Sequence, residues 1–532
     1  MTSTRGKSDM TLSLKRNQGM DSSVSGANAT NRPSVKGKSD KDVYLQKRML
    51  KPAFANSFHV WGLVVGAVIS GEFSGFNTGY AYGLGSMIVA HVFCSVLMIT
   101  VSLNLTELAT AMPFASGCAA YASAAFNGAV ACFIGYAYTF DMVFIGAQVT
   151  NFIGVCLQLI FATDIQYNVG YYFLTIFMCH GINFYPKVYF NVVTATTAIS
   201  CLLVVIPLFV MAPHFDFKDA FLTTIVAADG TITTSTDFLP FGIEGVINCS
   251  PLALYLLICF ECLPCCVEET QDVKTAIPRG MLAANITLVI VSWIAMVVCA
   301  GMPPGVSVLQ TALLPYSSML MTVFELSNAQ AVTLISLPSI FASQLAIYYA
   351  TTRYIYGLSR GGYMPPILSL TTSEGAPYTA MAATSLMFCA LSLFLQYSPV
   401  TNTGYIFLTM GSIFALTAYI VQPILYIRLK FRLPSLPRPF NMKMAGIVPA
   451  LINLIIACGI LIGMVYLNPI WRVCLLGIAI GYMLLVPFYL LVVRHYLKDS
   501  PEKMFIKRQL NSIMNESMRS SKQSSGSESM KA

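Results

Sequence analysis

Apolar residues recur along the chain in long stretches that are separated by short polar segments. About twelve of these stretches approach 20 residues, the length that an α-helix needs to cross a hydrocarbon core of roughly 30 Å. They are centred near residues 70, 95, 143, 176, 200, 257, 291, 345, 388, 415, 456 and 482. The pattern predicts an all-α integral membrane protein with 12 transmembrane helices.

Composition and charge agree with this pattern. Hydrophobic residues make up 56% of the 532-residue chain and charged residues only 10%, against roughly 25% charged residues in soluble proteins. The net charge of +8 does not indicate nucleic-acid binding, because 19 of the 31 Lys and Arg residues lie at the two ends, eleven in 1–57 and eight in 494–532. By the positive-inside rule, both termini and the basic segment 428–443 are predicted to be cytoplasmic, and the acidic segment 212–244 external.

The same pattern divides the chain into predicted segments. Both ends have little apolar content and are expected to be disordered, and the polar start argues against a cleaved signal peptide. The segments are a basic cytoplasmic tail (1–57), the first five spans (58–211), an extracellular loop (212–244), spans six to ten (245–430), two peripheral spans (446–493) and a second cytoplasmic tail (494–532). The plasma membrane is favoured over an organelle.

Two spans are interrupted near their middle. In the first, Ser70, Gly71 and Glu72 stand within an apolar run. Small residues suit helix packing, but an acid at this depth costs roughly 2.5–3.5 kcal/mol and indicates a cavity, a partner or a substrate. In the sixth, Pro264 lacks an N–H group and should open the helix beside Glu261. Irregular backbone at membrane depth survives only around a cavity or within protein, so both breaks predict a functional site.

The order of the two interrupted spans adds an expectation about the fold. They are five apart, which is typical of transporters built from inverted repeats, whose broken helices meet at the substrate. Two acids at such a site favour a cationic amine. In the third span, Tyr138 and Asp141 lie one helical turn apart, and a carboxylate beside an aromatic ring suits an ammonium group. The alternative for Asp141 is a structural hydrogen bond or ion pair with another helix.

Five motifs occur in order between residues 58 and 495. They are ISGEFSGFNTG (69–79), TELATAMPFASGCAAYASAAF (106–126), FECLPCCVEETQDVKTAIPRG (260–280), RYIYGLSRGGYMPPIL (353–368) and YIVQPILYIRLKFRLPSLPRPF (419–440). Together they resemble the amino acid–polyamine–organocation superfamily of transporters, and within it the ethanolamine permease group. The resemblance implies a LeuT-like fold of 5+5 inverted repeats with discontinuous helices 1 and 6, and two peripheral helices.

The resemblance also implies site residues. It places Ser70, Gly71, Glu72, Phe260, Glu261 and Cys262 at the substrate-contacting breaks, and Asp141 where the ethanolamine group also carries an acid. Cys262 departs from the usual glycine, which bears on the shape of the pocket. The helically spaced Cys259, Cys262, Cys265 and Cys266 have no histidine nearby, so we expect no metal site there.

The coupling ion stays open between sodium and a proton. Several proton-coupled relatives carry a lysine midway along the fifth span, but 188–209 has none there, and Thr196 or a neighbour takes its place. This disfavours lysine-based proton coupling. Thr351 and Thr352 of the eighth span are candidate sodium ligands beside first-helix carbonyls, the alternative being bonds to their own helix backbone.

Charged residues gather at the predicted inner ends of the spans. Solvation alone would account for them, but they are also candidates for an inner gate that opens when its ion pairs separate. The candidate gate residues are Glu107, Glu268, Glu269, Arg353 and Arg360.

These observations favour a secondary active transporter, a symporter or exchanger that moves a small amine or amino acid by alternating access, with an ethanolamine-like cation as substrate. A polyamine transporter, or a nutrient sensor of this fold that signals through its tails, are the alternatives. We expect no enzymatic activity, cofactor or nucleic-acid partner. The expected partners are the small-molecule substrate and the lipid bilayer, and the sequence predicts no oligomeric state.

Overall fold

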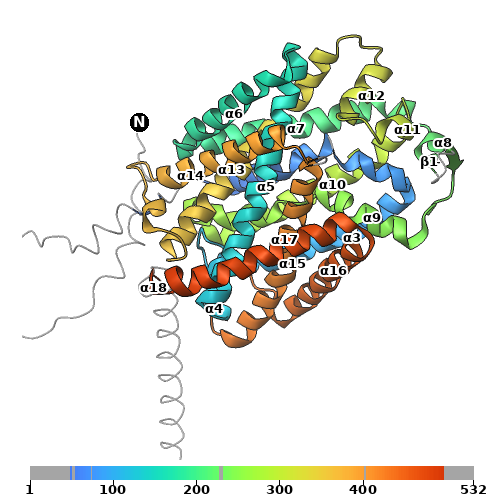
Figure 1. The fold of residues 1–532 in the computed structure, drawn as a ribbon. Helices are drawn as coiled ribbons and strands as arrows, with labels where there is room; N and C mark the ends of the chain where they lie inside the picture. Colours follow the sequence, from blue (N-terminus) through green and yellow to red (C-terminus); the bar gives the residue numbers. More distant parts are fainter. Residues whose placement is uncertain (1–47, 51–53, 74, 227–231, 401–402, 497–532) are drawn as a thin grey trace, which may run out of the picture. The chain divides into compact units, whose positions relative to one another are not determined.

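The computed structural model describes residues 48–496 except 51–53, 74, 227–231 and 401–402. In this part of the chain nearly all regular structure is helical (Figure 1). Almost all of the two predicted tails, 1–57 and 494–532, lies outside the described residues, and their predicted disorder stays a prediction.

The first half of the bundle contains the first interrupted segment and four further long helices. Short 3-10 helices carry the label η. The elements are α2 (Ser57–Val68), η1 (Ile69–Glu72), η2 (Phe76–Tyr82), α3 (Leu84–Ala111), α4 (Cys118–Ala125), α5 (Gly128–Phe161), η3 (Ile165–Tyr167), α6 (Asn168–Asn183) and α7 (Pro186–Met211).

The second half begins with the other interrupted segment and ends with two long helices after α15. Its elements are α9 (Gly242–Tyr255), η5 (Phe260–Glu269), α10 (Val273–Ala300), α11 (Val306–Leu309), α12 (Pro315–Val323), α13 (Ala329–Arg360), η6 (Pro366–Ser369), α14 (Tyr378–Tyr397), α15 (Thr403–Arg432), η7 (Lys443–Gly446), α16 (Ile447–Leu467), α17 (Pro469–Phe488), the π-helix η8 (Tyr489–Val493) and α18 (Arg494–Tyr496).

The predicted external segment 212–244 departs from the all-helical prediction. After η4 (Ala212–His214) and α8 (Phe217–Ala220), strand β1 (Thr223–Val226) pairs antiparallel with β2 (Ile232–Ser235), with Thr223 opposite Ser235. Threonine and isoleucine are β-branched and favour extended backbone. The two strands form a small hairpin outside the helical bundle.

The number of membrane spans follows from helix length and apolarity. Within the described ranges, nine helices are long and apolar enough to cross a bilayer, and Ser57–Glu72 with Phe76–Tyr82, bent by 46°, would make a tenth. The helices α6, with 16 residues, and α9, with 14, are shorter than the roughly 20 residues that a span needs. A multi-pass helical membrane protein is therefore confirmed, whereas the count of 12 spans and the inverted repeat stay predictions.

The sixth segment unwinds beside Glu261, where the sequence predicts a break. Helix α9 ends at Tyr255, η5 begins at Phe260, and Cys259 between them has a left-handed φ of 78°. Pro264 within η5 has no N–H to donate to the carbonyl of Phe260, which removes one α-helical hydrogen bond from this stretch. The chain is already open at 256–259, five to eight residues before the proline.

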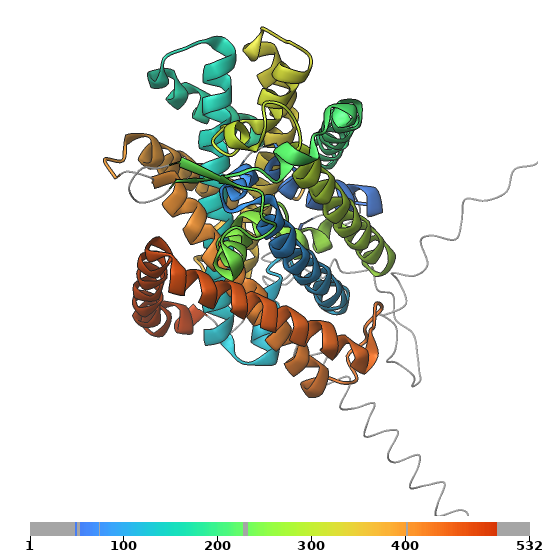
Figure 2. The same cartoon turned by 90° about the vertical axis from the view of Figure 1, so that its right-hand side faces the viewer.

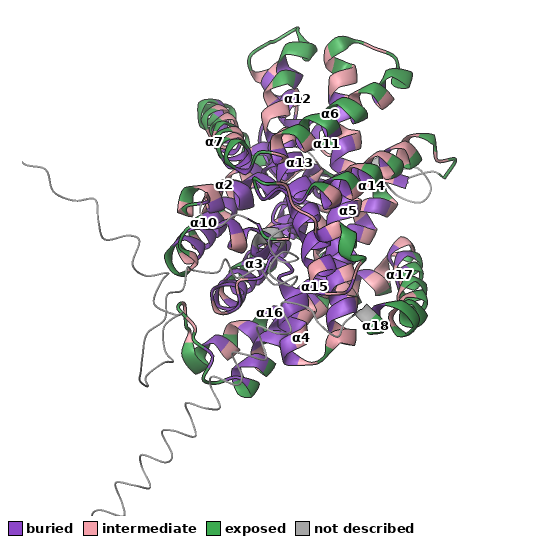
Figure 3. Ribbon diagram, turned by 90° about the vertical axis from the view of Figure 1, so that its left-hand side faces the viewer, coloured by how far each residue is buried: buried purple, intermediate pink, exposed green. Residues whose placement is uncertain are grey.

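Helices α5 and α13 lie in the interior of the bundle, whereas α7, α14 and α17 present exposed faces to the outside (Figures 2 and 3). The α13 segment Gln344–Ser359 is buried throughout, and α13 packs against α2, α5 and α7. Exposed Leu, Ile and Phe side chains cover the outer helices. Such an exposed apolar surface is what lipid-facing helices require.

We predict that Gly357→Ala destabilises the protein by about 1–3 kcal/mol, because overpacking forces the backbone to shift. A Cβ on Gly357 of α13 would lie 2.6 Å from the backbone nitrogen of Ser116. Gly459 of α16 has no atom within 4 Å of such a Cβ, so Gly459→Ala should be neutral or stabilise by at most about 1 kcal/mol. Thermal unfolding of the two variants in detergent compares them, and equal melting temperatures would contradict the prediction.

Candidate functional site

The two interrupted segments lie against each other. A Cβ on Gly71 of η1 would stand 3.0 Å from the carbonyl oxygen of Tyr255, the last residue of α9, and one on Gly75 would stand 2.8 Å from the Tyr255 ring. Gly75 also has a φ of 91°, a conformation that side chains rarely adopt. Glycine at these positions therefore lets the first break pack directly on the second.

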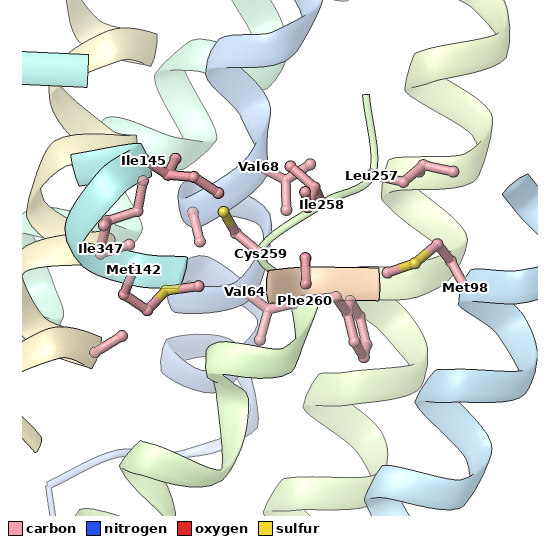
Figure 4. Close-up of a cluster of buried hydrophobic side chains, with 14 of the residues drawn as sticks. Val64, Val68, Met98, Met142, Ile145, Leu257, Ile258, Cys259, Phe260 and Ile347 are labelled. Atoms are coloured by element: carbon pink, nitrogen blue, oxygen red, sulfur yellow. The ribbon is translucent and has the colours of Figure 1, made fainter. Parts of the chain in front are cut away.

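Apolar side chains of helices α2 and α5 lie around the second break. Figure 4 shows Val64 and Val68 of α2, together with Met142 and Ile145 of α5, around Cys259 and Phe260. Phe260 and Cys259 are each only 1% exposed. Of the predicted site residues in this stretch, Phe260 thus belongs to an apolar cluster, and the side chain of Cys262 lies outside the described part of the structure.

Two acids meet within this apolar surrounding. Asp141 of α5 and Glu261 of η5 are 0% and 1% exposed, and their carboxyl groups lie close enough to interact with each other. Apart from the two carboxyl groups themselves, no side chain of the described residues donates a hydrogen bond to either Asp141 oxygen or to Glu261 Oε1, and none of the ion pairs found there includes either acid. The sequence singled out both residues but did not predict that they meet.

Three tyrosines from three helices frame the acidic pair. The Tyr419 hydroxyl of α15 donates to Glu261 Oε2, and the Tyr354 hydroxyl of α13 donates to the Glu261 backbone carbonyl at 2.7 Å. The rings of Tyr138 and Tyr354 lie 5.8 Å apart, and Tyr138 interacts with both acids. Tyr354 and Tyr419 escaped the sequence analysis, although both lie within the motifs that begin at residues 353 and 419.

Glu72 faces different neighbours from those of Glu261. Its carboxylate is fully buried, and within the described ranges neither of its oxygens has a hydrogen-bond partner. It interacts with the thiols of Cys201 on α7 and Cys299 on α10. In the part of the chain that the structure describes, no hydrogen bond or ion pair joins Glu72 to Glu261.

The hydroxyls predicted for sodium bind their own helix. Thr351 donates to the carbonyl of Ile347 at 2.8 Å, and Thr352 donates to that of Tyr349 at 2.7 Å. Two serines on the preceding turns of α13 reach the first segment instead: Ser343 donates to the carbonyl of Gly66 at 2.7 Å, and Ser339 donates to that of Ile69 at 2.9 Å. Ser343 also accepts the N–H of Ser70 at 3.2 Å. These two serines, which the sequence analysis missed, tie α13 to the first break.

The candidate gate residues form specific ion pairs. Arg353, which is fully buried, holds Glu269 with two hydrogen bonds of 3.0 and 3.1 Å and lies 3.9 Å from the ring centre of Tyr349. Tyr349 also donates to Glu269. Arg360, two turns after Arg353 on α13, pairs with Glu268, the residue that precedes Glu269 in η5. Glu268 also accepts the N–H of Ala115 at 2.8 Å.

Glu107 is held by a separate group of donors at the same end of the bundle. This buried acid on α3 accepts hydrogen bonds from the Tyr426 hydroxyl at 2.8 Å and from the Met442 N–H at 3.0 Å. It also forms ion pairs with Lys430 and Arg438. The candidate gate acids are therefore not simply hydrated at the ends of the helices, because each of them has a basic partner on another segment.

A hollow lies on the side of the acidic pair that is opposite to these ion pairs. It has a volume of about 310 Å³ and is lined by residues of η2, α9, α15, α16 and α17, including Thr78, Asn248, Ser412 and Trp471. Ser412 precedes Tyr419 by seven residues on α15, which corresponds to about 10 Å along the helix axis. The hollow is thus on the side of Glu261 that the positive-inside rule predicts to be external.

Comparisons with known proteins identify the family. The amino acid permease family model matches residues 56–486. The chain is 23% identical over 256 residues to the methylthioribose transporter of Bacillus subtilis (strain 168), which covers 46% of this chain and 50% of that protein. It is 22% identical over 228 residues to the branched-chain amino acid permease BcaP of the same organism, covering 40% and 44%.

A plant relative matches a shorter part. The cationic amino acid transporter 2, vacuolar, of Arabidopsis thaliana is 25% identical over 192 residues, which cover 34% of this chain and 28% of that protein. The chain thus spans about half of the length of these three relatives, or less.

The family match covers both breaks, the acidic pair and the inner ion pairs. The relatives are named for different substrates, so they do not identify one for this chain, and the similarity to the ethanolamine group stays a prediction. The family consists of permeases rather than enzymes, in agreement with the sequence analysis. This chain belongs to the amino acid permease family.

Proposed function

We propose that the protein is a secondary active transporter that carries a small amine or amino acid through the membrane by alternating access, with an ethanolamine-like cation as the favoured substrate. The observation that carries the proposal is the buried pair Asp141 and Glu261, which has no basic protein partner in the described residues. The pair lies where two interrupted segments meet.

Electrostatics explains why such a pair favours a cation. Two adjacent carboxylates repel each other when both are ionised, and burial without a partner adds a large cost. An ammonium group 4 Å from each acid would gain about 4 kcal/mol per contact at an effective dielectric constant of 20. Tyr138 and Tyr354 add aromatic faces that attract a cation.

The substrate could be longer than a single amine and carry more than one positive charge. A polyamine is the second candidate, because Glu72 provides a further buried acid without a partner, on the side of the first break that faces α7 and α10. The alternative of a sensor that signals through its tails depends on segments outside the described residues, and no contact in the structure favours it.

Alternating access requires that one path be closed while the other is open. The ion pairs Arg353–Glu269 and Arg360–Glu268 join α13 to η5 on the side predicted to be cytoplasmic, and the hollow that contains Ser412 lies on the opposite side. We propose that these pairs form the closed inner gate and that the hollow is the outer entrance to the acidic pair.

A proton is the coupling ion that the geometry favours. Among the described residues, neither oxygen of Glu72 has a hydrogen-bond donor or a cationic partner, and a buried carboxyl group in such surroundings costs far less free energy in its neutral form than as an ion. The hydroxyls of Ser339 and Ser343 already have carbonyl acceptors. We therefore propose that Glu72 holds the coupling proton in the closed protein.

Glu261→Gln is expected to abolish saturable amine uptake into proteoliposomes, because removing one charged partner of a buried pair costs at least about 2 kcal/mol, or roughly 30-fold in affinity. Glu244→Gln, at the exposed first turn of α9 in the same broken segment, should leave uptake unchanged. Saturable uptake by Glu261→Gln at the unaltered rate would remove the central residue from the proposal.

Glu72→Gln is expected to retain exchange of amine against amine while losing the response of uptake to a pH gradient, because glutamine can neither bind nor release the coupling proton. Ser343→Ala should keep that response. Uptake into proteoliposomes under a pH gradient and, separately, a sodium gradient distinguishes the two ions. Uptake that follows sodium and is lost in Ser343→Ala would disprove proton coupling.

A double-mutant cycle tests the gate. Glu269→Gln leaves a buried arginine unpaired and should cost about 3–5 kcal/mol of stability. Substitutions of Arg353 and Glu269 should therefore show a coupling energy of about 1–3 kcal/mol. Glu268 is the adjacent residue but pairs with Arg360, so the cycle of Arg353 with Glu268 should be additive within about 0.5 kcal/mol. Thermal unfolding and uptake are both measured, and additivity in both cycles would contradict the assignment.

A further inference from the structure

Two arginines near the end of α15 have no acidic partner among the residues that the structure describes. Arg428 and Arg432 lie one helical turn apart and are exposed. Other nearby cations do have carboxylate partners, since Lys430 and Arg438 both pair with Glu107, as Arg353 and Arg360 pair with their own acids. Within the described ranges, no carboxylate forms an ion pair with Arg428 or Arg432.

Both guanidinium groups are nevertheless fixed in place. Arg428 Nε donates to the carbonyl of Ala125 at 2.7 Å, and Arg432 Nη1 donates to the same oxygen at 2.8 Å. Arg428 also lies 4.3 Å from the ring centre of Phe126. A guanidinium group has five N–H donors, so each arginine keeps several of them for another acceptor. Ala125 ends α4, and the two side chains therefore point in a common direction set by that helix end.

These arginines line a hollow with apolar walls. The hollow has a volume of about 580 Å³, and its other lining residues are Phe126, Ile424, Ile427 and Phe431. Phe431 is 65% exposed and Ile424 is 39% exposed. Two guanidinium groups without a carboxylate partner in the described residues therefore lie beside exposed apolar side chains. A ligand that satisfies both must carry a negative charge at one end and hydrocarbon at the other.

The position of the hollow fits a lipid. It lies along the last turns of α15, next to the basic segment 428–443, which the positive-inside rule predicts to be cytoplasmic. Helix ends of this kind lie where the hydrocarbon core meets the headgroups. Basic pockets between helices at that depth recognise anionic headgroups.

We propose that Arg428 and Arg432 form a binding site for an anionic phospholipid of the cytoplasmic leaflet. The two guanidinium groups bind the phosphate, for which their planar arrangement of N–H donors is suited. An acyl chain lies against Phe431 and Ile424. A free phosphate ion would leave the apolar wall uncovered, and a zwitterionic lipid has no net negative charge to offset that of the two arginines. The site is separate from the acidic pair and does not depend on which solute is transported.

Native mass spectrometry and thermal unfolding of the purified full chain test this site. Delipidated protein in detergent is titrated with phosphatidylserine and with phosphatidylcholine of the same acyl chains. Phosphatidylserine should bind more tightly and raise the melting temperature more. Each basic residue near an anionic surface contributes about 1 kcal/mol, or roughly fivefold in affinity, so the Arg428→Gln/Arg432→Gln protein should bind phosphatidylserine roughly 30-fold more weakly.

The variants are chosen to separate binding from folding. Glutamine keeps an N–H donor for the Ala125 carbonyl, and Arg428→Lys/Arg432→Lys keeps both charges and should retain a preference for phosphatidylserine even if the glutamine protein unfolds. Arg279→Gln, at an exposed arginine of α10 outside the hollow, should bind like the unaltered protein.

Four results would overturn the proposal, and the first three concern the lipids and the double variant. These are equal affinity for the two lipids, an unchanged lipid preference in a folded Arg428→Gln/Arg432→Gln protein, and binding of water-soluble glycerophosphoserine as tight as that of the whole lipid. The last result would mean that phosphate recognition alone accounts for the site. Loss of the preference in Arg279→Gln would likewise contradict it, because a diffuse surface charge would then suffice.

Discussion

The arrangement of the bundle depends on one electrostatic constraint, two carboxyl groups that share a buried space without a basic residue. Asp141 and Glu261 come from α5 and η5 and meet among apolar side chains. Without a cation, such a pair is tolerable only if at least one proton is retained. Tyr419 donates to one carboxyl oxygen of Glu261, and Tyr354 donates to its backbone carbonyl. The other oxygen of Glu261 and both oxygens of Asp141 stay available to a ligand. The pair is therefore suited to exchanging a proton for a cationic ligand.

The acids of this protein fall into two groups that differ in their partners. Glu107, Glu268 and Glu269 each pair with a lysine or an arginine at the end predicted to be cytoplasmic. Glu72, Asp141 and Glu261 lie deeper, and no ion pair in the described residues includes them. A buried ion pair is costly to form and costly to break, which suits a closure that must be either shut or fully open. The unpaired acids suit groups that change partners in each cycle.

The sequence was a good guide where the signal is local. The predicted breaks lie beside Glu261 and among the glycines around Glu72, as local helix-breaking residues indicate, although the second one opens at 256–259, before Pro264. It was a poor guide to contacts between distant segments. Which hydroxyl groups of α13 reach the first segment depends on how that helix is rotated about its axis. Only the fold shows that Ser339 and Ser343 donate to the first segment. Thr351 and Thr352 donate to carbonyls of their own helix instead. Likewise, Tyr419 lies 158 residues from Glu261, and nothing in its local pattern indicates that contact.

Helix α15 contacts both the acidic pair and the cluster of residues that binds Glu107. Tyr419 reaches Glu261, and one helix face further along carries Tyr426 and Lys430, which both bind Glu107. Pro423 lies between the two contacts and cannot donate to the carbonyl four residues earlier, that of Tyr419 itself. A missing hydrogen bond of this kind is a common site of helix bending. The part of α15 that holds Glu261 can therefore change its angle while the part anchored to Glu107 stays in place, so that a change at the acidic pair need not break the Glu107 cluster.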